Sequence, residues 1–248
     1  MKFLGIDLGW QSGASGLCCL GSDPEAPQRL HLLDCDRRTD TEEILAWVDA
    51  CLPGDEPGAI AVDAPTLIPN ATGMRLPDRL MHKHMGRYHA GCYPANLGRP
   101  FAQRTVAFGL NLEARGFRHA PEIQPRQPGR YQMEVFPHAA SVRLFGLERI
   151  LKYKKGAIAQ RRVELGKFYQ YLLDKLPLLE PSLDLATDEK SEGGGGLGRG
   201  SGRIQNEQLK IKNSSPPLPL PSSLPERGAD LKALEDCLDA CLCAYVAA

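Results

Sequence analysis

The run Phe3-Leu4-Gly5-Ile6-Asp7-Leu8 is apolar except for one acidic side chain near its end. A short run of this composition predicts a buried β-strand over 3–8. A carboxylate at the carboxyl end of a strand lies where open α/β sheets bind their ligands. The run Ala59-Ile60-Ala61-Val62-Asp63 repeats the pattern, again with an acid at its end. Two strands that end in carboxylates therefore suggest a site at one edge of a sheet.

The segments around this strand predict the order of the other elements. Further strands are expected over 16–20, 30–34, 59–62 and 132–136, and helices over 157–176 and 230–247, the last one capped by Asp230. Residues 39–41 offer N-caps for another helix before the strand over 59–62. Three strands, a helix, a strand, and then a later strand and helices is the order of an RNase H-like α/β fold, a mixed sheet flanked by helices. A Rossmann sheet, whose strands and helices alternate from the first element, is excluded.

Residues 187–229 differ in composition from the rest of the chain. They hold eight Gly, five Pro and six Ser, and no aromatic residue. Such a segment cannot bury enough apolar surface to offset the entropy lost on ordering. Because an apolar helical pattern resumes after it, we expect a disordered insertion over 187–229. The remaining residues, 1–186 and 230–248, would then form a single RNase H-like domain.

The composition of the whole chain is that of a globular protein. It has 248 residues, of which 42% are hydrophobic and 24% charged, and its formal net charge is zero. No run approaches the roughly 18 apolar residues of a membrane span, and Asp7 interrupts the apolar stretch that a signal peptide needs. Eight cysteines without a Cys-x-x-Cys pair favour reduced, buried thiols over a disulfide framework. We therefore expect a cytoplasmic protein.

Four acidic residues lie in apolar surroundings: Asp7, Asp63, Glu134 and Asp239. An isolated ionised carboxylate in a low-dielectric interior is costly unless it is paired or bound to a metal. Carboxylates that converge repel one another, and a divalent cation that prefers oxygen ligands relieves the repulsion. Taken singly, each acid also fits a loop edge or a helix cap. Asp236 lies three residues before Asp239 on the same helix face, either as a further metal ligand or as a solvated surface acid.

Basic residues are concentrated in the middle of the chain. Residues 1–69 hold four Lys or Arg against twelve Asp or Glu, whereas residues 70–130 hold ten against three. A basic segment suits a polyanion, because Arg and Lys bind phosphate oxygens without regard to sequence. A solvated helix face explains the same pattern. The run Lys152-Tyr153-Lys154-Lys155 is either a second phosphate contact or a surface loop. The candidate nucleic-acid contacts are Arg75, Arg79, Lys83, Arg87, Arg99 and Arg104.

Five segments resemble one family of proteins. They are Gly5-Ile6-Asp7-Leu8-Gly9, Val62-Asp63-Ala64-Pro65, Tyr93-Pro94-Ala95-Asn96, Met133-Glu134-Val135-Phe136-Pro137-His138 and Glu235-Asp236-Cys237-Leu238-Asp239-Ala240-Cys241-Leu242-Cys243-Ala244-Tyr245. In this order they resemble the family catalogued as domain of unknown function 429, which is described as a predicted RNase H-like nuclease. The resemblance covers residues 1–175 and 230–248.

The resemblance implies a metal-dependent nuclease, a phosphodiester hydrolase that acts on nucleic acid. Asp7 would bridge two Mg²⁺ or Mn²⁺ ions about 3.5–4 Å apart, and Asp63 or Glu134 would supply further ligands. Asp239, with Asp236 beside it, resembles the closing acids of Holliday-junction resolvases, which also begin a late helix. The implied catalytic residues are Asp7, Asp63, Glu134 and Asp239, and the implied metal ligands are the same four and Asp236.

Two other functions fit parts of the sequence. One is a catalytically inactive RNase H-like module that binds nucleic acid or a protein partner. The other is an ATPase of the sugar-kinase and actin type, because Gly9, Ser12, Gly13 and Ser15 resemble a loop whose backbone N–H groups hold phosphate. Cleavage with bound Mn²⁺, binding without cleavage, and nucleotide binding are the outcomes that separate the three functions.

Overall fold

A mixed sheet of seven strands forms the centre of the part of the chain that the structure describes, residues 1–9, 13–120, 127–185 and 228–248 of a computed structural model. The strands are β1 (Lys2–Asp7), β2 (Ser15–Ser22), β3 (Arg29–Arg38), β4 (Gly58–Val62), β5 (Arg118–His119), β6 (Arg130–Glu134) and β7 (Ser182–Leu183). They lie in the order β5-β6-β4-β1-β2-β3-β7. β2 is antiparallel to both of its neighbours, β1 and β3, and every other pair of adjacent strands is parallel.

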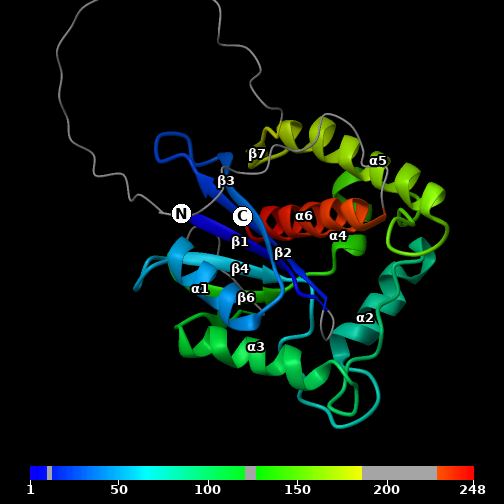
Figure 1. Cartoon of the computed structure of the whole chain (residues 1–248), viewed down its shortest axis with the longest axis horizontal. Coiled ribbons are helices and arrows are strands. Elements are labelled where there is room, and N and C mark those ends of the chain that lie inside the picture. The colour runs from blue at the N-terminus through cyan, green and yellow to red at the C-terminus, as the bar shows by residue number, and fades with distance from the viewer. Residues whose placement is uncertain (10–12, 121–126, 186–227) are drawn as a thin grey trace, which may run out of the picture.

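Helices cover both faces of this sheet (Figure 1). They are α1 (Thr41–Cys51), α2 (Leu76–Met85), α3 (Ala102–Ala114), α4 (Pro137–Phe145), α5 (Ile158–Lys175) and α6 (Gly228–Ala247), with short 3-10 turns at Gly86–Tyr88 and Leu176–Leu178. α1 and α3 lie on one face, and α4, α5 and α6 lie on the other. The predicted α/β class, a mixed sheet flanked by helices, is confirmed.

β1 is buried on both faces, which explains its nearly continuous apolar sequence. Successive side chains of a strand point to opposite faces of the sheet. Leu4 and Ile6 belong to the hydrophobic core that contains α1 and α3, whereas Phe3 belongs to the core that contains α5 and α6. The strand therefore connects the two cores, and its odd-numbered residues face α6.

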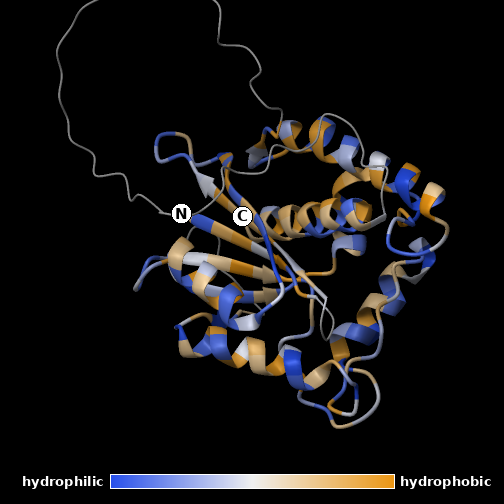
Figure 2. Cartoon of the chain, in the orientation of Figure 1, coloured by the Kyte–Doolittle hydropathy of each residue, from blue (hydrophilic) through white to orange (hydrophobic). Residues whose placement is uncertain are grey.

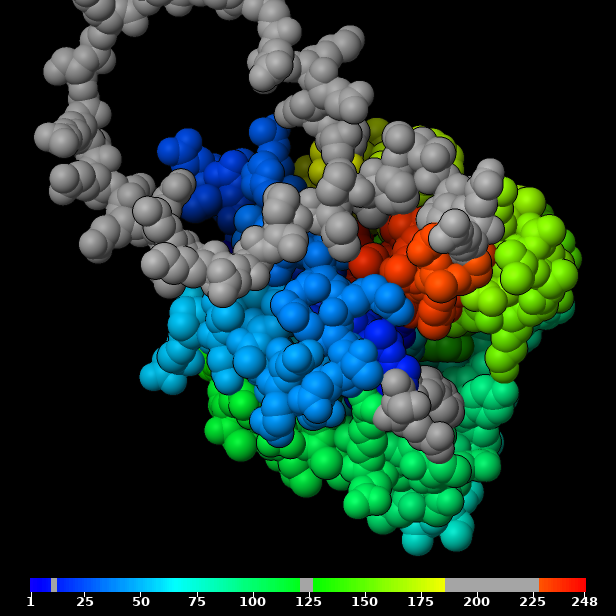
Figure 3. All heavy atoms as spheres, viewed as in Figure 1, coloured from blue at the N-terminus to red at the C-terminus, as the bar shows by residue number. Residues whose placement is uncertain are grey.

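Helix α6 lies directly against β1 and β2 because glycine occupies the points of closest approach. A Cβ atom added at Gly5 would overlap the carbonyl oxygen of Ala240, and one added at Gly16 would overlap the carbonyl oxygen of Asp236. The helix is apolar around most of its circumference, as Figure 2 shows, and such helices are buried in the interior. In the space-filling view α6 is seen as red atoms beside the yellow-green α5 (Figure 3).

Several element boundaries differ from the sequence-based expectation. β6 ends at Glu134 and not at 136, and α6 begins at Gly228, so Asp230 lies in its first turn and does not cap it. Of the insertion predicted over 187–229, residues 187–227 lie outside the described residues, and residues 228–229 are helical, contrary to the prediction. Strands β5 and β7 and helices α2, α3 and α4 were not among the expected elements.

All eight cysteines are free thiols, seven of them buried and Cys92 half-buried. Within the described ranges, no helix combines the length and the apolar character that crossing a membrane requires.

Candidate metal centre

Three carboxylates meet at the carboxyl ends of β1 and β4. Asp7 is the last residue of β1, Asp63 directly follows β4, and Asp239 lies on α6. One carboxylate oxygen of each lies within 4.8 Å of the others. Asp7 is 8% exposed and Asp239 is fully buried. We call Asp7, Asp63 and Asp239 the acid cluster; it contains three of the five predicted metal ligands.

The strand register explains why these acids face the same helix. β1 and β4 are parallel, with Ile6 opposite Val62, and the Asp63 N–H donates to the Ile6 carbonyl at 2.8 Å. Ile6 and Val62 both pack on the side of α1 and α3. Because side chains alternate along a strand, Asp7 and Asp63, each one residue further on, point to the side of α6.

The ammonium group of Lys154 lies among the three carboxylates. Its Nζ is 3.0 Å from Asp63 Oδ2 and 2.9 Å from Asp239 Oδ2. The hydroxyl of the adjacent, buried Tyr153 donates to Asp239 Oδ1 at 2.6 Å. The sequence indicated only a phosphate contact or a surface loop here. It missed that Tyr153 belongs to the core and that Lys154 enters the acid cluster.

The pKa values indicate that the negative charge of the acid cluster is only partly balanced. Burial is the main cause that raises the pKa of Asp7 well above its usual range and the pKa of Asp239 to about 6, and Lys154 opposes both shifts. Burial alone would lower the pKa of Lys154. The attraction of Asp239, Asp63 and Asp7 outweighs burial and raises the pKa of Lys154, so this side chain is protonated at neutral pH.

Glu134 lies outside the acid cluster and pairs with an arginine. In the parallel pair of β4 and β6, Glu134 is opposite Val62, so its side chain points away from α6. Its carboxylate oxygens accept from Arg75 Nη1 and Nη2 at 2.7 and 2.8 Å. Arg75 Nη2 also lies 2.8 Å from Asp78 Oδ1. We call Arg75, Asp78 and Glu134 the arginine network.

Asp236 is buried, but it does not join the acid cluster either. Its Oδ2 accepts from Arg37 of β3 at 2.8 Å, and Lys232, one turn earlier on α6, lies 2.5 Å from its Oδ1. The backbone of α6 at Asp236 lies against Gly16 of β2. Because α6 crosses the sheet, residues one turn apart lie over different strands, and only Asp239 meets the ends of β1 and β4.

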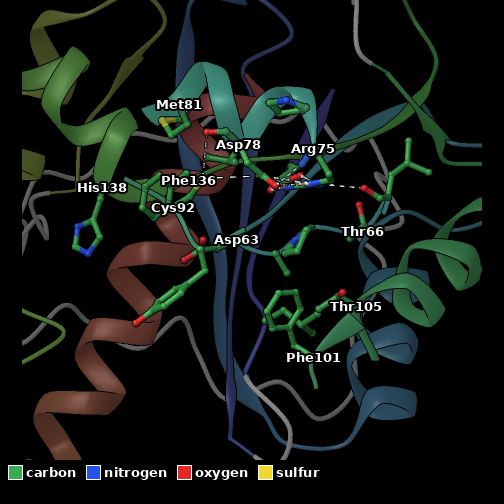
Figure 4. Close-up of a pocket in the computed structure, with 18 of the residues that line it drawn as sticks. Asp63, Thr66, Arg75, Asp78, Met81, Cys92, Phe101, Thr105, Phe136 and His138 are labelled. Atoms are coloured by element: carbon green, nitrogen blue, oxygen red, sulfur yellow. Dashed lines mark hydrogen bonds and ion pairs between the residues drawn. The ribbon is translucent and has the colours of Figure 1, made fainter. Parts of the chain in front are cut away.

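A cleft of about 1450 Å³ opens beside the acid cluster. Asp63 and Lys154 line it, whereas Asp7 and Asp239 do not. Figure 4 shows Asp63 and His138 on one side of the cleft and Phe101 on the other. Burial is the main cause that lowers the pKa of His138 to about 4, so its imidazole is uncharged at neutral pH.

The predicted nucleic-acid contacts are divided between the interior, the cleft and the outer surface. Arg75 is buried in the arginine network. Arg79 is exposed at the cleft, and Arg104 lines it with Nε and Nη2 atoms that are buried and have no hydrogen-bond partner within the described ranges. The residues that are exposed but do not line the cleft are Lys83, Arg87 and Arg99.

The atoms of the acid cluster suit a hard divalent cation. Carboxylate oxygens are the ligands that Mg²⁺ and Mn²⁺ prefer in proteins. Asp239 Oδ2 is buried and forms an ion pair with Lys154, whose Nζ also pairs with Asp63. One ammonium group among three carboxylates leaves the cluster with an excess of negative charge, which is costly in a low dielectric unless a further cation balances it. Asp7, Asp63 and Asp239 therefore fit a metal ion and are the residues that would hold it.

One family model matches residues 5–248, and its description is "Protein of unknown function (DUF429)". The chain belongs to the DUF429 family. Membership in DUF429 confirms the resemblance that the motifs around Asp7, Asp63, Glu134 and Asp239 indicate. No curated protein and no solved structure matches the chain. The DUF429 description assigns no activity, so the chemistry of the site has to be argued from its geometry.

Proposed function

We propose that this DUF429 chain is a metal-dependent phosphodiester hydrolase that acts on nucleic acid. The observation that carries the proposal is the acid cluster, in which three carboxylates from β1, the end of β4 and α6 lie within 4.8 Å of one another beside a large cleft. The strand order β3-β2-β1-β4-β6, with β2 antiparallel to both neighbours, supports an RNase H-like fold.

The groups at the cleft suit hydrolysis of a phosphodiester. In this reaction a water oxygen bonds to phosphorus, the bond from phosphorus to the leaving oxygen breaks, and the leaving oxygen takes a proton derived from the water. A bound divalent cation supplies Lewis-acid polarisation of the phosphate and lowers the pKa of coordinated water. Asp7, Asp63 and Asp239 hold that cation, and Lys154 at the cleft wall pairs with a phosphate oxygen.

The walls of the cleft support a nucleic acid as the substrate. Arg79 and Arg104 supply positive charge for phosphates, and the exposed Tyr93 supplies a ring on which a base stacks. Arg104 is the most informative of these residues, because its buried and unpaired N–H groups cost free energy until a ligand accepts hydrogen bonds from them.

A catalytically inactive nucleic-acid-binding module is the second candidate function. The ion pairs of Lys154 with Asp63 and Asp239 favour it, because a protein cation already contacts the acids that would hold the metal. The third function, an ATPase, rests on a loop of which residues 10–12 lie outside the described residues. The part of this loop that is described shows only a hydrogen bond from the Gly9 N–H to Ser15 Oγ, at 3.0 Å.

The proposal is tested with labelled single-stranded and duplex DNA and RNA, incubated with Mn²⁺ or with EDTA. We expect cleavage of at least one substrate in Mn²⁺ and none in EDTA. Asp7→Asn should abolish cleavage because it removes a metal ligand. Asp49→Asn is the matched control, since Asp49 is an exposed acid that pairs with Arg115 at the surface.

Three results would change the proposal in different ways. Full cleavage by Asp7→Asn would contradict the metal site. Binding of nucleic acid and Mn²⁺ without cleavage would favour the inactive module. The third result concerns the substrate. If the substrate is nucleic acid, the affinity should fall as the salt concentration rises, with a log–log slope of roughly −0.7 to −0.9 per phosphate contacted. If a small phosphodiester is cleaved independently of salt, the protein is still a hydrolase, but the proposal that its substrate is nucleic acid is contradicted.

A further inference from the structure

The acid cluster holds less negative charge than a centre for two divalent cations requires. Of the five acids that the sequence proposed as ligands, Glu134 pairs with Arg75, and Asp236 pairs with Arg37 and Lys232. Three carboxylates remain. Metal binding requires deprotonated carboxylates, and three of these together with the ammonium group of Lys154 carry two net negative charges, which a single divalent cation balances. A second divalent cation would leave the buried site with an excess of positive charge, which is costly in a low dielectric.

We infer that Lys154 supplies the second positive charge of the metal centre, so that the site binds one divalent cation and not two. The inference rests on the proposed function and specifies its metal content. It replaces the two-ion centre that the family resemblance implies with one ion and one ammonium group.

The structure holds Lys154 in place more firmly than a surface lysine. The preceding residue, Tyr153, is fully buried, stacks on Phe168 at a centroid distance of 5.0 Å, and donates to Asp239. Its carbonyl accepts from Arg161 Nε at 2.9 Å. The backbone on one side of Lys154 is therefore anchored in the core, and its side chain reaches two acids from a fixed position.

The position of Lys154 also suits contact with a substrate. Lys154 and Asp63 line the cleft, whereas Asp7 and Asp239 are buried and do not. A phosphate group that enters the cleft therefore meets the ammonium group at the cleft wall. A lysine presents a point charge with three N–H donors, so it offsets negative charge on the phosphate without taking ligands away from the metal ion.

The number of bound ions distinguishes one cation from two. We would titrate the wild-type chain with Mn²⁺ and count bound ions by the loss of the free-ion EPR signal. We would then record the spectrum of the bound ions, because two Mn²⁺ ions about 3.5–4 Å apart are exchange-coupled. We expect one bound ion without exchange coupling in the wild type. Lys154→Met should bind a second Mn²⁺ ion, because three carboxylates then lack a protein cation.

Stability without metal gives a second measurement that does not depend on activity. In EDTA, Lys154→Met should lower Tm by about 5 to 10 °C, because it leaves buried carboxylates without their counter-ion. Saturating Mn²⁺ should restore most of this loss. Lys154→Arg keeps the charge and should bind one ion. The matched control is Lys2→Met, since Lys2 is a similarly half-buried lysine that pairs with Glu56 outside the cluster.

The outcomes separate this inference from the proposed function. Two exchange-coupled ions in the wild type, or one ion in both the wild type and Lys154→Met, would overturn the role of Lys154 and leave the metal-dependent hydrolase intact. A wild type that binds no Mn²⁺ would contradict the proposed function itself. If Lys154→Met does not fold, the wild-type ion count and the Lys154→Arg variant still decide the question.

Discussion

The acid cluster and the arginine network border the same cleft, yet their carboxylates behave in opposite ways. Burial raises the pKa of Asp7 and of Asp239. Burial also acts to raise the pKa of Asp78, but hydrogen bonds from Arg75 and from the Ala95 N–H outweigh it, and the pKa of Asp78 is lowered. Two groups of acids beside one cleft therefore differ in how their charge is compensated.

The difference follows from the donors that each carboxylate receives. Asp78 accepts from the Arg75 backbone N–H at 3.0 Å, from the Arg75 guanidinium and from the Ala95 N–H at 3.0 Å. Asp239 accepts from Tyr153, and its Oδ2 lies near one ammonium group. A buried acid with a full set of donors is a structural element. Buried acids that share one ammonium group indicate a site where a further cation binds.

The largest expected effect separates the two acids of α6. Asp239→Asn should lower Mn²⁺-dependent cleavage by at least about a thousandfold, roughly 4 kcal/mol of transition-state stabilisation, because it removes a metal ligand. Asp236→Asn should leave Mn²⁺ affinity nearly unchanged, since Asp236 pairs with Arg37 and Lys232 outside the acid cluster. Cleavage rates and Mn²⁺ titrations measure both effects. Equal losses of Mn²⁺ affinity in the two variants would contradict the conclusion that Asp239 is a metal ligand and Asp236 is not.

The next effect concerns stability, and its sign should differ between the two groups. Asp78→Asn should lower the free energy of unfolding by about 3 kcal/mol, because it leaves the buried Arg75 with one charged partner fewer. Asp7→Asn in EDTA should leave the free energy of unfolding unchanged or raise it, because it relieves repulsion with Asp63 and Asp239. Urea denaturation in EDTA compares them. A similar loss in both variants would show that the two groups do not differ.

A smaller effect is expected where α6 packs on the sheet. Gly5→Ala should cost about 1–3 kcal/mol, because the added methyl group overlaps the backbone of α6. It should also weaken Mn²⁺ binding, since α6 carries Asp239, while the arginine network, which lacks any residue of α6, stays intact. Gly86→Ala is the control, because a Cβ atom at Gly86 meets nothing within 4 Å. An unchanged Mn²⁺ affinity in a destabilised Gly5→Ala variant would contradict this coupling.

The smallest effect is a pH dependence of opposite sign in the two groups. The folded-state pKa of Asp239, about 6, exceeds its usual value of 3.8, so the folded state holds this proton more tightly. In EDTA its contribution to stability is therefore present below 3.8 and is lost as pH rises through about 6, by at most about 1.4 kcal/mol per pH unit. The lowered pKa of Asp78 has the reverse effect, because its contribution is present at neutral pH and lost in acid.

The free energy of unfolding, measured from pH 4 to 7 in EDTA, checks this pH dependence. Asp239→Asn should make the decline toward neutral pH shallower without abolishing it, because the raised pKa of Asp7 gives a decline of the same sign, and Asp78→Asn should leave the decline in place. A decline as steep in Asp239→Asn as in the wild type would place its origin at another group.

The sequence predicted part of the acid cluster because strand geometry is local. Asp7 and Asp63 each follow an apolar strand, and the carboxyl ends of parallel strands lie at the same edge of a sheet. Glu134 shows the limit of this reasoning. Glu134 lies opposite Val62, one residue before the position opposite Asp63. A shift of one residue moves a side chain to the other face of the sheet. The strand pattern gives the presence of β6, but it does not give the register of β6 against β4.

Lys154 could not be predicted from spacing, because it comes from a segment without regular structure between α4 and α5. Only the three-dimensional path of the chain brings it to the acids. The one available signal was the tyrosine before it, since a large aromatic residue within a basic run indicates an anchor in the core. Helix α6 was predicted from its apolar pattern, and its glycine contacts with β1 and β2 decide which of its two acids reaches the site.

The contribution of Asp239 by α6 has a consequence for the synthesis of the protein. Asp7 and Asp63 leave the ribosome early, whereas the third acid follows only when α6 has been made and has packed on β1 and β2. Until then a nascent chain carries two acids of the cluster and no complete metal site. Under the proposed function, a nascent chain whose α6 has not yet packed on the sheet cannot cleave the messenger RNA from which it is being translated.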